Sequence, residues 1–290
     1  MCDGYEVPMS ITPGSIAGVD DAGRTNLGTV PSPTLSFTGE RIVPGQVSEP
    51  LFRAHEERYV FAGKFVKDKA VLDVACGAGI GTHYLLTAGA RCCTGLDIDD
   101  PSICYARAMY KGCEFSQCDA TNLCVPDNSM DVVVSFETIE HLKDHLKFLS
   151  ECNRVLKPGG VLICSTPNHT ISRWARENIY HLHEFTVAEF TRALETIFVD
   201  VTLFGQKSTN QLVSAARGLL SRVLYRLHLL EITKRLLTRE APVYVRTKFL
   251  STSADPDYVV QPYRGTPLTQ PNYVIAVARA RPGVSRGGSL

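Results

Sequence analysis

A short apolar run that passes directly into a glycine-rich turn narrows the choice of folds more than any other stretch of this sequence. Residues 70–75 read AVLDVA, and Gly77, Gly79 and Gly81 follow at once. A run of this kind is typical of a buried strand, while glycine accepts positive φ and lets a ligand approach the backbone closely. The pattern predicts a strand–turn–helix unit of an α/β sheet, with a ligand bound at the turn.

Short apolar runs and helical stretches alternate along much of the remaining chain. Such alternation is typical of βαβ units, so we predict an α/β fold with a doubly wound, Rossmann-like sheet of seven mostly parallel strands and a helical cap insertion. The expected strands are residues 70–75, 91–97, 113–118, 131–136, 161–165, 199–204 and 273–278. The expected helices are residues 51–66, a stretch ending near 87, and residues 102–110, 142–156 and 186–197.

The outer parts of the chain differ from this core in composition. Residues 1–37 are rich in Gly, Pro, Ser and Thr and predict a mobile arm. We place a cofactor-binding core at 38–205, a helical insertion or cap at 206–270, the last core strand at 271–280 and a flexible tail at 281–290. Within the insertion, residues 211–239 are amphipathic and basic, which favours a cap over the site or a homodimer contact, with a membrane-surface helix as the alternative.

Charge and cysteine content exclude several classes of partner. The 30 Lys and Arg residues balance 30 Asp and Glu residues, so we expect neither nucleic acid nor an anionic membrane surface as a partner. No apolar run reaches the length of about 18 residues that a membrane-spanning helix needs. The ten cysteines show no CxxC spacing, and no secretory signal precedes them. We therefore expect a cytoplasmic protein with mostly buried, reduced thiols.

The surroundings of the glycine turn argue against a dinucleotide. Thr82 occupies the third glycine position of the G-x-G-x-x-G pattern, and Asp73 lies inside the strand just before the turn. A carboxylate there would repel a pyrophosphate but not a cofactor that carries an ammonium and a sulfonium. A nicotinamide-dependent oxidoreductase is therefore disfavoured.

Two further acidic positions follow predicted strands. Asp97 closes the second strand and can accept both ribose hydroxyls of an adenosine. Its alternative role is to cap the next helix, for which Asp99 and Asp100 are better placed. Asp119, with Ala120 behind it, follows the third strand and can meet an adenine edge, or can be an ordinary turn residue.

Four ordered blocks between residues 70 and 167 resemble the class I S-adenosylmethionine-dependent methyltransferases: VLDVACGAGIGTHYL, GLDIDD, CDATNLCVPDNSMDVVVSFETIEHL and RVLKPGGVLICSTPN. FTGERIVPG (37–45) and HLHEFTVAEF (181–190) are similar to a bacterial branch that modifies sugars and specialised metabolites. The resemblance implies S-adenosylmethionine as cofactor, S-adenosylhomocysteine as product, and Asp97 as a cofactor ligand. It also implies a pocket lined by Ala75, Gly77, Ile98, Asp119, Ala120 and Phe136. Arg58 matches an arginine that anchors the cofactor carboxylate in ubiquinone-pathway O-methyltransferases.

The run Glu137-x-x-Glu140-His141 follows the fourth strand at the ligand-binding edge of the sheet. His141 is a candidate general base or acceptor contact, or else a helix cap. Two carboxylates and an imidazole also suit Mg²⁺ or Zn²⁺, and the matching run in ubiquinone-pathway enzymes is associated with a divalent metal. We predict no resident metal.

Residues 178–185 (NIYHLHEF) resemble the N-P-[YF]-H-V-[KR]-E-F run of the same family. Ile179 replaces the proline, and His183 replaces the basic residue. The resemblance implies that His181 faces the acceptor pocket.

These residues lead to an expected activity. We predict methyl transfer from S-adenosylmethionine to a hydroxyl of a small molecule in specialised-metabolite biosynthesis, with His141 and His181 as base candidates beside Glu137 and Glu140. The alternatives are an amine acceptor, a sugar or polysaccharide acceptor, and a non-catalytic cofactor-binding module. A nucleic-acid methyltransferase is disfavoured because the chain lacks an Asn-Pro-Pro-Tyr run.

Overall fold

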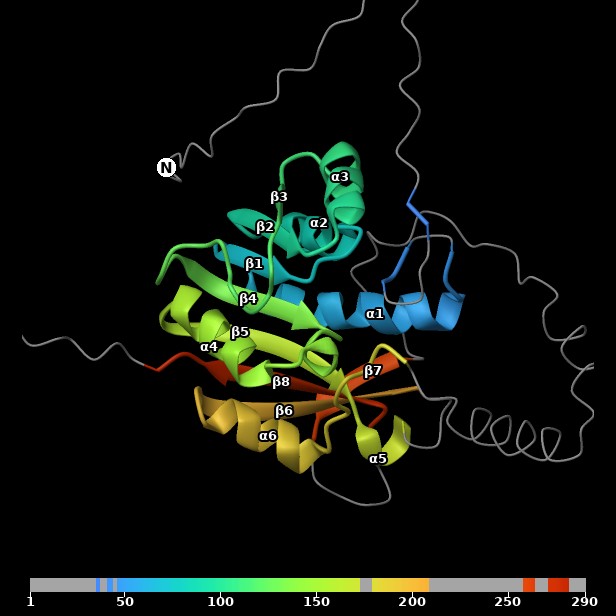
Figure 1. Ribbon diagram of the computed structural model, residues 1–290, viewed down its shortest axis with the longest axis vertical. Coiled ribbons are helices and arrows are strands. Elements are labelled where there is room, and N and C mark those ends of the chain that lie inside the picture. The colour runs from blue at the N-terminus through green and yellow to red at the C-terminus, as the bar shows by residue number, and fades with distance from the viewer. Residues whose placement is uncertain are drawn as a thin grey trace, which may run out of the picture. The chain divides into compact units, whose positions relative to one another are not determined.

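The computed structural model places an eight-stranded sheet at the centre of the described part of the chain (Figure 1). The structure describes residues 35–36, 41–43, 46–172, 179–208, 258–263 and 271–281. The strands are β1 (Ala70–Val74), β2 (Cys92–Asp97), β3 (Glu114–Gln117), β4 (Met130–Phe136), β5 (Leu156–Pro167), β6 (Val199–Ser208), β7 (Tyr258–Pro262) and β8 (Tyr273–Arg279). The helices are α1 (Glu49–Ala62), α2 (Ile80–Thr87), α3 (Asp100–Met109), α4 (His145–Val155), α5 (His169–Ser172) and α6 (Val187–Glu195), with short 3₁₀ turns η1 (Gly63–Phe65) and η2 (Ile139–His141).

The strand order is β3-β2-β1-β4-β5-β8-β6-β7. The pairs from β3 across to β5 are all parallel, whereas β8 runs antiparallel to both β5 and β6. The order reverses beside β1, so the connections wind outward in both directions. Ligands in such sheets bind where the strand order reverses, beyond the carboxyl ends of the strands.

Helices cover both faces of this sheet, as the strand composition requires. Leu72 and Val133 point into a core with α4 and α6, whereas their neighbours Val71 and Val132 point into a second core with α1 and α2. Successive strand residues face opposite sides, so a strand that is apolar throughout needs cover on both. The predicted doubly wound α/β class is confirmed.

The strand count differs from the prediction. β7 lies inside the segment predicted as a helical insertion, and it pairs antiparallel with β6 from Phe204 opposite Pro262 to Ser208 opposite Tyr258. A run of five residues is too short to give a clear periodic pattern, and its pairing with a distant strand leaves no local signal. The predicted helix at 211–239 lies outside the described residues.

The region between β4 and β5 also differs in detail. The helix predicted for 142–156 begins later, at His145, where the Asp144 side chain accepts a hydrogen bond from the Lys147 amide at 3.0 Å. The preceding Glu140 and His141 form η2 instead. The Lys157–Gly160 stretch, which lies between the predicted helix and the strand predicted for 161–165, belongs to β5 itself.

The predicted terminal segments are described only in part. Leu35, near the end of the predicted arm, is buried against Val43 and Ala78, so the folded part begins before residue 37. Most of the arm and tail lies outside the described residues. Cys76, Cys93, Cys152 and Cys164 are buried as expected, while two cysteines, Cys104 and Cys124, are exposed. None of the described helices is long and apolar enough to cross a membrane.

Candidate active site

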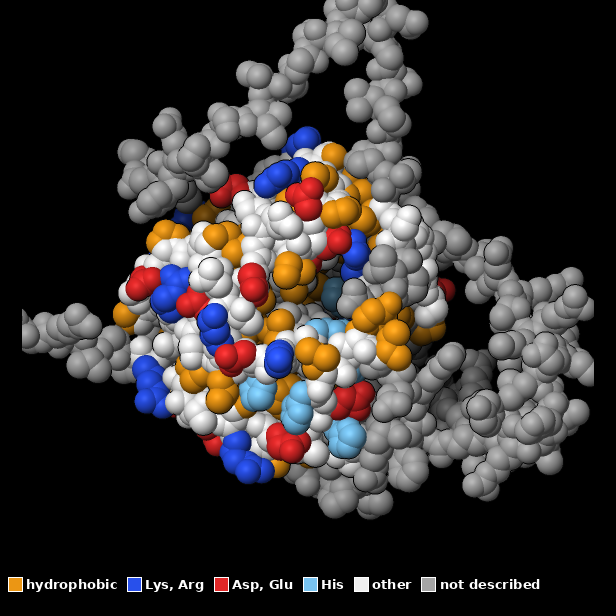
Figure 2. Space-filling view, viewed as in Figure 1, with side chains coloured by type: hydrophobic (Ala, Val, Ile, Leu, Met, Phe, Trp, Pro, Cys, Tyr) orange, Lys and Arg blue, Asp and Glu red, His pale blue; other side chains and the backbone are white. Residues whose placement is uncertain are grey.

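A cavity of about 540 Å³ opens where β1, β2 and β4 end (Figure 2). In Figure 2, histidine side chains lie in and below a hollow near the middle of the view. The cavity brings together residues from many parts of the chain because the carboxyl ends of parallel strands share one edge. All of the predicted site residues line it: Arg58, Ala75, Gly77, Asp97, Ile98, Asp119, Ala120, Phe136, Glu137, Glu140, His141 and His181.

The glycine turn forms one wall of the cavity. Ala75, Gly77 and Gly79 have φ of 59°, 54° and 79°, a left-handed region that costs a non-glycine residue free energy. A side chain at Gly79 or Gly81 would collide with packed neighbours, at 2.6 Å from Ala106 Cβ and 2.0 Å from the Tyr59 ring. At Gly77 the nearest atom would be Arg41 Cβ, 3.8 Å away. Gly77 is therefore the glycine that leaves open space for a ligand.

Asp97 joins the end of β2 to this turn. Its carboxylate accepts hydrogen bonds from the Gly77 amide at 2.7 Å and from the Asp99 amide at 2.9 Å. Burial raises the pKa of Asp97, and these two amides act against that rise. Each amide occupies one acceptor position, so the carboxylate keeps capacity for further donors from the cavity. Asp99, rather than Asp97, caps α3.

Asp73 does not line the cavity, contrary to its expected role beside the cofactor. Its side chain is fully buried and accepts hydrogen bonds from Thr82 Oγ1 at 2.6 Å and from the Tyr59 hydroxyl at 3.1 Å. Burial raises its pKa to about 7. The carboxyl therefore ties β1 to α1 and α2 from within the core. Thr82, at the third glycine position of the motif, provides one of these hydrogen bonds.

Arg58 extends from α1 to the cavity, and side chains from several parts of the chain hold it in place. Its guanidinium donates to Gln206 Oε1 at 2.8 Å, lies 3.2 Å from His55 Nδ1, and stacks 4.5 Å from the centre of the Tyr273 ring. Burial and the Arg58 charge lower the pKa of His55 to about 3, so His55 is neutral and accepts this bond. Arg58 Nε is buried without a hydrogen-bond partner in the described residues. This donor suits an anionic ligand group.

Two histidines that line the cavity approach each other. The His141 and His181 ring centres are 4.9 Å apart. His141 Nδ1 lies 3.0 Å from the Tyr180 carbonyl oxygen, and His181 Nδ1 lies 3.1 Å from Glu184 Oε1. These acceptors favour the tautomer in which each Nδ1 carries the proton.

The two predicted glutamates have different surroundings. Glu137 accepts a hydrogen bond from Ser165 Oγ at 2.7 Å. Glu140 is fully buried and accepts one from Thr166 Oγ1 at 3.2 Å, while its Oε1 has no partner among the described residues. Burial, with the charge of Glu137 added, raises the pKa of Glu140 well above its usual range.

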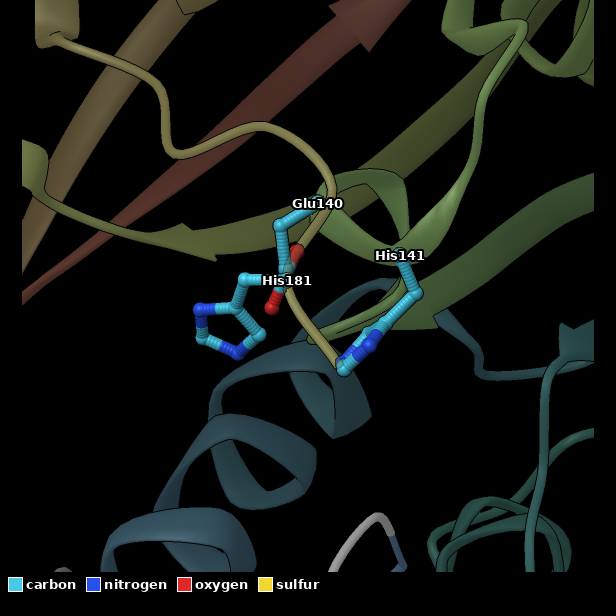
Figure 3. Close-up of side chains that lie close together, drawn as sticks. All are labelled: Glu140, His141 and His181. Carbon is cyan, nitrogen blue, oxygen red and sulfur yellow. The ribbon is translucent and has the colours of Figure 1, made fainter. Parts of the chain in front are cut away.

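Glu140, His141 and His181 lie together in Figure 3, with the carboxyl between the two rings. One ligand atom from each falls within 4.8 Å of the others, so these three residues could hold a divalent ion. Glu137, the other carboxylate of the E-x-x-E-H run, is not part of this cluster.

The cavity is also lined by residues that the sequence did not single out as site residues. Those with polar or aromatic side chains include Arg41, His55, Glu184, Asn272 and Tyr273. Arg41 and Glu184 lie inside the two outer sequence blocks that resemble the bacterial branch, so a local signal existed for them. Tyr273 and Asn272 reach the cavity only through the antiparallel pairing of β8, for which the local sequence gives no signal.

Comparisons with known proteins show what this chain is similar to. A family model described as "Methyltransferase domain" matches residues 72–164. A Mycolicibacterium smegmatis protein named a probable S-adenosylmethionine-dependent methyltransferase is 40% identical over 171 residues, 58% of this chain and 66% of that protein. Residues 72–164 therefore match a methyltransferase domain, and the chain is similar to proteins named as S-adenosylmethionine-dependent methyltransferases. A similarly named Mycobacterium tuberculosis protein is 36% identical over 176 residues, and this chain covers 64% of it. This chain thus spans just under two thirds of the length of these relatives.

Solved structures show the same fold at low sequence identity. A methyltransferase from Thermotoga maritima is 16% identical, with a TM-score of 0.53 over 80% of this chain and 94% of that one. One from Archaeoglobus fulgidus is 17% identical, with a TM-score of 0.50 over the same shares of the two chains. The chain therefore has the class I methyltransferase fold. The relatives are named as dependent on S-adenosylmethionine, and the open space at Gly77, the spare acceptor capacity of Asp97 and the unpartnered Arg58 Nε fit that molecule.

Proposed function

We propose that this chain methylates a hydroxyl group of a small molecule in specialised-metabolite biosynthesis. The observation that carries the proposal is a single cavity that is lined both by residues suited to a cofactor and by two adjacent histidines. Bound S-adenosylmethionine supplies an electrophilic methyl group on a sulfonium.

The proposed cofactor end comprises Arg58, Ala75, Gly77, Asp97, Ile98, Asp119, Ala120 and Phe136. Asp97 accepts the ribose hydroxyls, and Arg58 binds the carboxylate of the amino-acid end. Holding two reactants in line in this way can supply roughly 7–11 kcal/mol of the barrier.

The proposed acceptor end comprises Glu137, Glu140, His141 and His181. A hydroxyl must lose its proton as it is methylated, and a positioned base contributes about 10²–10⁴-fold to the rate. His181 is the preferred base because the Glu184 carboxylate accepts from its Nδ1 and so stabilises the imidazolium that forms. His141, held by the Tyr180 carbonyl, positions the acceptor.

A hydroxyl acceptor is also in keeping with the printed names of more distant relatives. A Mycobacterium tuberculosis protein named phthiotriol/phenolphthiotriol dimycocerosates methyltransferase is 36% identical over 139 residues, which cover 46% of this chain and 52% of that protein. A triol offers hydroxyl groups as acceptors. An amine acceptor is the second candidate, because a neutral amine needs no base.

The test uses S-adenosylmethionine labelled on its methyl group with panels of polyols, phenols and amines. We expect label on oxygen, and we expect His181→Ala to lower turnover by about 10²–10⁴-fold with little change in cofactor affinity. His183→Ala is the matched control, since His183 lies in the same loop but is exposed and does not line the cavity.

Three results would contradict the proposal. Label on nitrogen, with both His141→Ala and His181→Ala within a few-fold of wild type, would assign an amine acceptor and catalysis by proximity alone. Loss of activity with EDTA and its return with Mg²⁺ would assign the Glu140 cluster to a metal instead of a base. Cofactor binding without transfer to any panel member would favour a binding module.

A further inference from the structure

The chain segment before α1 lies across the glycine turn. Its described part, Arg41–Val43, comes from the FTGERIVPG block, to which neither the fold nor the proposed function has yet assigned a role. Val43 and Leu35 are buried against Ala78 of the turn. The Gln46 side-chain amide donates to the Leu35 carbonyl at 2.6 Å and so holds this segment together. The glycine turn is therefore covered on this side by protein.

Arg41 ties the segment to the start of α3. Its guanidinium donates to Asp99 Oδ2 and to Ser102 Oγ, the latter at 2.7 Å. These partners lie 58 and 61 positions further along the chain, and the Arg41 side chain is only 15% exposed. Asp99 also accepts from the Ser102 amide as the cap of α3. Arg41 thus bridges two elements that meet at the cavity edge, and both Arg41 and Ile42 line the cavity.

The negative charge of the carboxylates near Arg41 is offset by its guanidinium. Asp97, Asp99 and Asp119 all line the cavity, whereas the other arginine that lines it, Arg58, is clamped between α1 and β6. Burial acts against ionisation of Asp99, but hydrogen bonds from Ser102 and the charge of Arg41 lower its pKa overall. The charge of Arg41 also opposes the rise that burial imposes on the pKa of Asp97. Arg41 therefore offsets repulsion between two carboxylates that lie two residues apart.

We propose that Arg41 and Ile42 form the outer wall of the cofactor pocket around its adenosine end, and that Arg41 acts there by positioning Asp99 and Asp97. Arg41 engages Asp99 and leaves Asp97 to accept the ribose hydroxyls, while Ile42 supplies apolar surface against the nucleoside. Loss of the Arg41 side chain leaves Asp99 uncompensated beside Asp97 and opens the pocket to water. The inference rests on the proposed position of adenosine at Asp97.

The test measures binding by calorimetry, without any acceptor. Two ligands are compared: S-adenosylhomocysteine, and 5′-methylthioadenosine, which has the adenosine end but no amino-acid end. We expect Arg41→Ala to raise the Kd of both ligands by a similar factor of about ten, the effect of losing one charge-assisted contact. Arg53→Ala is the control, because Arg53 forms an exposed pair with Glu49 and does not line the cavity.

Further variants guard against a general loss of structure. Arg41→Lys keeps the charge but not the forked donor and should fall between wild type and Arg41→Ala. Asp99→Asn can still cap α3 but cannot form the ion pair, so Arg41→Ala should weaken binding less in that background than in wild type. Thermal unfolding shows whether each variant is folded.

Wild-type Kd values for a folded Arg41→Ala variant would overturn the proposal. So would a weaker affinity for S-adenosylhomocysteine alone, because Arg41 would then act on the amino-acid end. Asp97→Asn reports separately on the assumed position of adenosine: if it changes neither Kd while Arg41→Ala raises both, the nucleoside lies against Arg41 but not on Asp97. The effect of Arg41→Ala on cofactor binding is measured without an acceptor, so it does not depend on whether the acceptor group is a hydroxyl.

Discussion

Asp73 and Asp97 lie on neighbouring strands, β1 and β2, yet their surroundings give them different tasks. Asp73 faces the core and holds β1 to two helices through Tyr59 and Thr82. Asp97 faces the cavity and is held by backbone amides, which keep its orientation without using all its acceptor capacity. At the scale of single residues, the direction of a side chain therefore separates a carboxyl of the core from one that lines the cavity.

Replacement of Asp97 by Ala should lower the affinity for S-adenosylmethionine by at least about tenfold, because two charge-assisted hydrogen bonds to the ribose would be lost. Calorimetry with the purified variant measures the effect. Replacement of Asp100, an exposed residue of α3 that does not line the cavity, is the control. Unchanged affinity in folded Asp97→Ala would remove this residue from the binding site.

Asp73 should make stability depend on pH. Its pKa is about 7 in the folded chain against 3.8 for an ordinary aspartate, so the folded state keeps a proton that the unfolded state releases. The free energy of unfolding should therefore fall as pH rises between these values, by up to about 1.4 kcal/mol per pH unit from this group. In Asp73→Asn, the free energy of unfolding measured with urea should fall less steeply between roughly pH 5 and pH 7, which lies within that window.

The difference between the two slopes isolates Asp73, because Glu140, whose pKa burial also raises, titrates in both proteins. Asp100→Asn controls for the simple loss of a carboxyl group. Parallel stability curves for wild type and Asp73→Asn would show that the folded state ionises Asp73 without a cost.

At the scale of elements, the start of α6 fixes the loop that carries His181. Thr186 Oγ1 caps the helix, and the Glu189 side chain bonds back to the Thr186 amide, which completes a capping box. Phe185 and Phe190, immediately before the cap and in the first turn, have ring centres 6.1 Å apart and form a hydrophobic staple. Upstream, the amides of Leu182 and His183 donate to the Glu140 carbonyl. The loop is therefore fastened at both ends.

Thr186→Ala should lower the free energy of unfolding by about 1 kcal/mol, the usual cost of a lost N-cap. Urea unfolding measures the change, and Thr186→Ser, which keeps the capping hydroxyl, should be close to wild type. Cofactor affinity should not change, because Thr186 does not line the cavity. A loss of stability equally large in Thr186→Ser would assign the effect to packing of the methyl group instead.

At the scale of the whole molecule, the pairing of β6 with β7 brings together the two ends of the segment that connects them. Ser208 lies directly opposite Tyr258, so a short Asn-Gly turn could replace residues 209–257 and close a hairpin. The sequence predicts that this segment contains a helix that caps the acceptor side. The replacement should therefore leave cofactor binding intact and abolish methyl transfer.

Calorimetry with S-adenosylhomocysteine and the labelled-methyl assay measure the two effects on the same preparation. Normal turnover on the acceptor would remove the cap function from this segment. Loss of cofactor affinity in a folded variant would instead show that the segment contributes to the cofactor end.

The sequence by itself determined the parts of this protein that depend on local pattern. Strands that are apolar on both faces required helices on both sides, and the glycine turn marked the ligand edge of the sheet. Asp97 and Glu137 could be found because each lies at or just beyond the end of a parallel strand, and such ends meet at one edge. Every predicted site residue accordingly lines one cavity.

Only the tertiary structure decided features that depend on contacts between distant segments. Asp73 turned away from the cavity because Thr82 and Tyr59 bond it from two helices. Tyr273 reached Arg58 because β8 runs antiparallel beside β5, and β7 formed because β6 offered it an edge. A strand edge can pair with many other strands, and a buried donor can bond many acceptors. The sequence near either one does not show which distant segment the packing of the chain will place beside it.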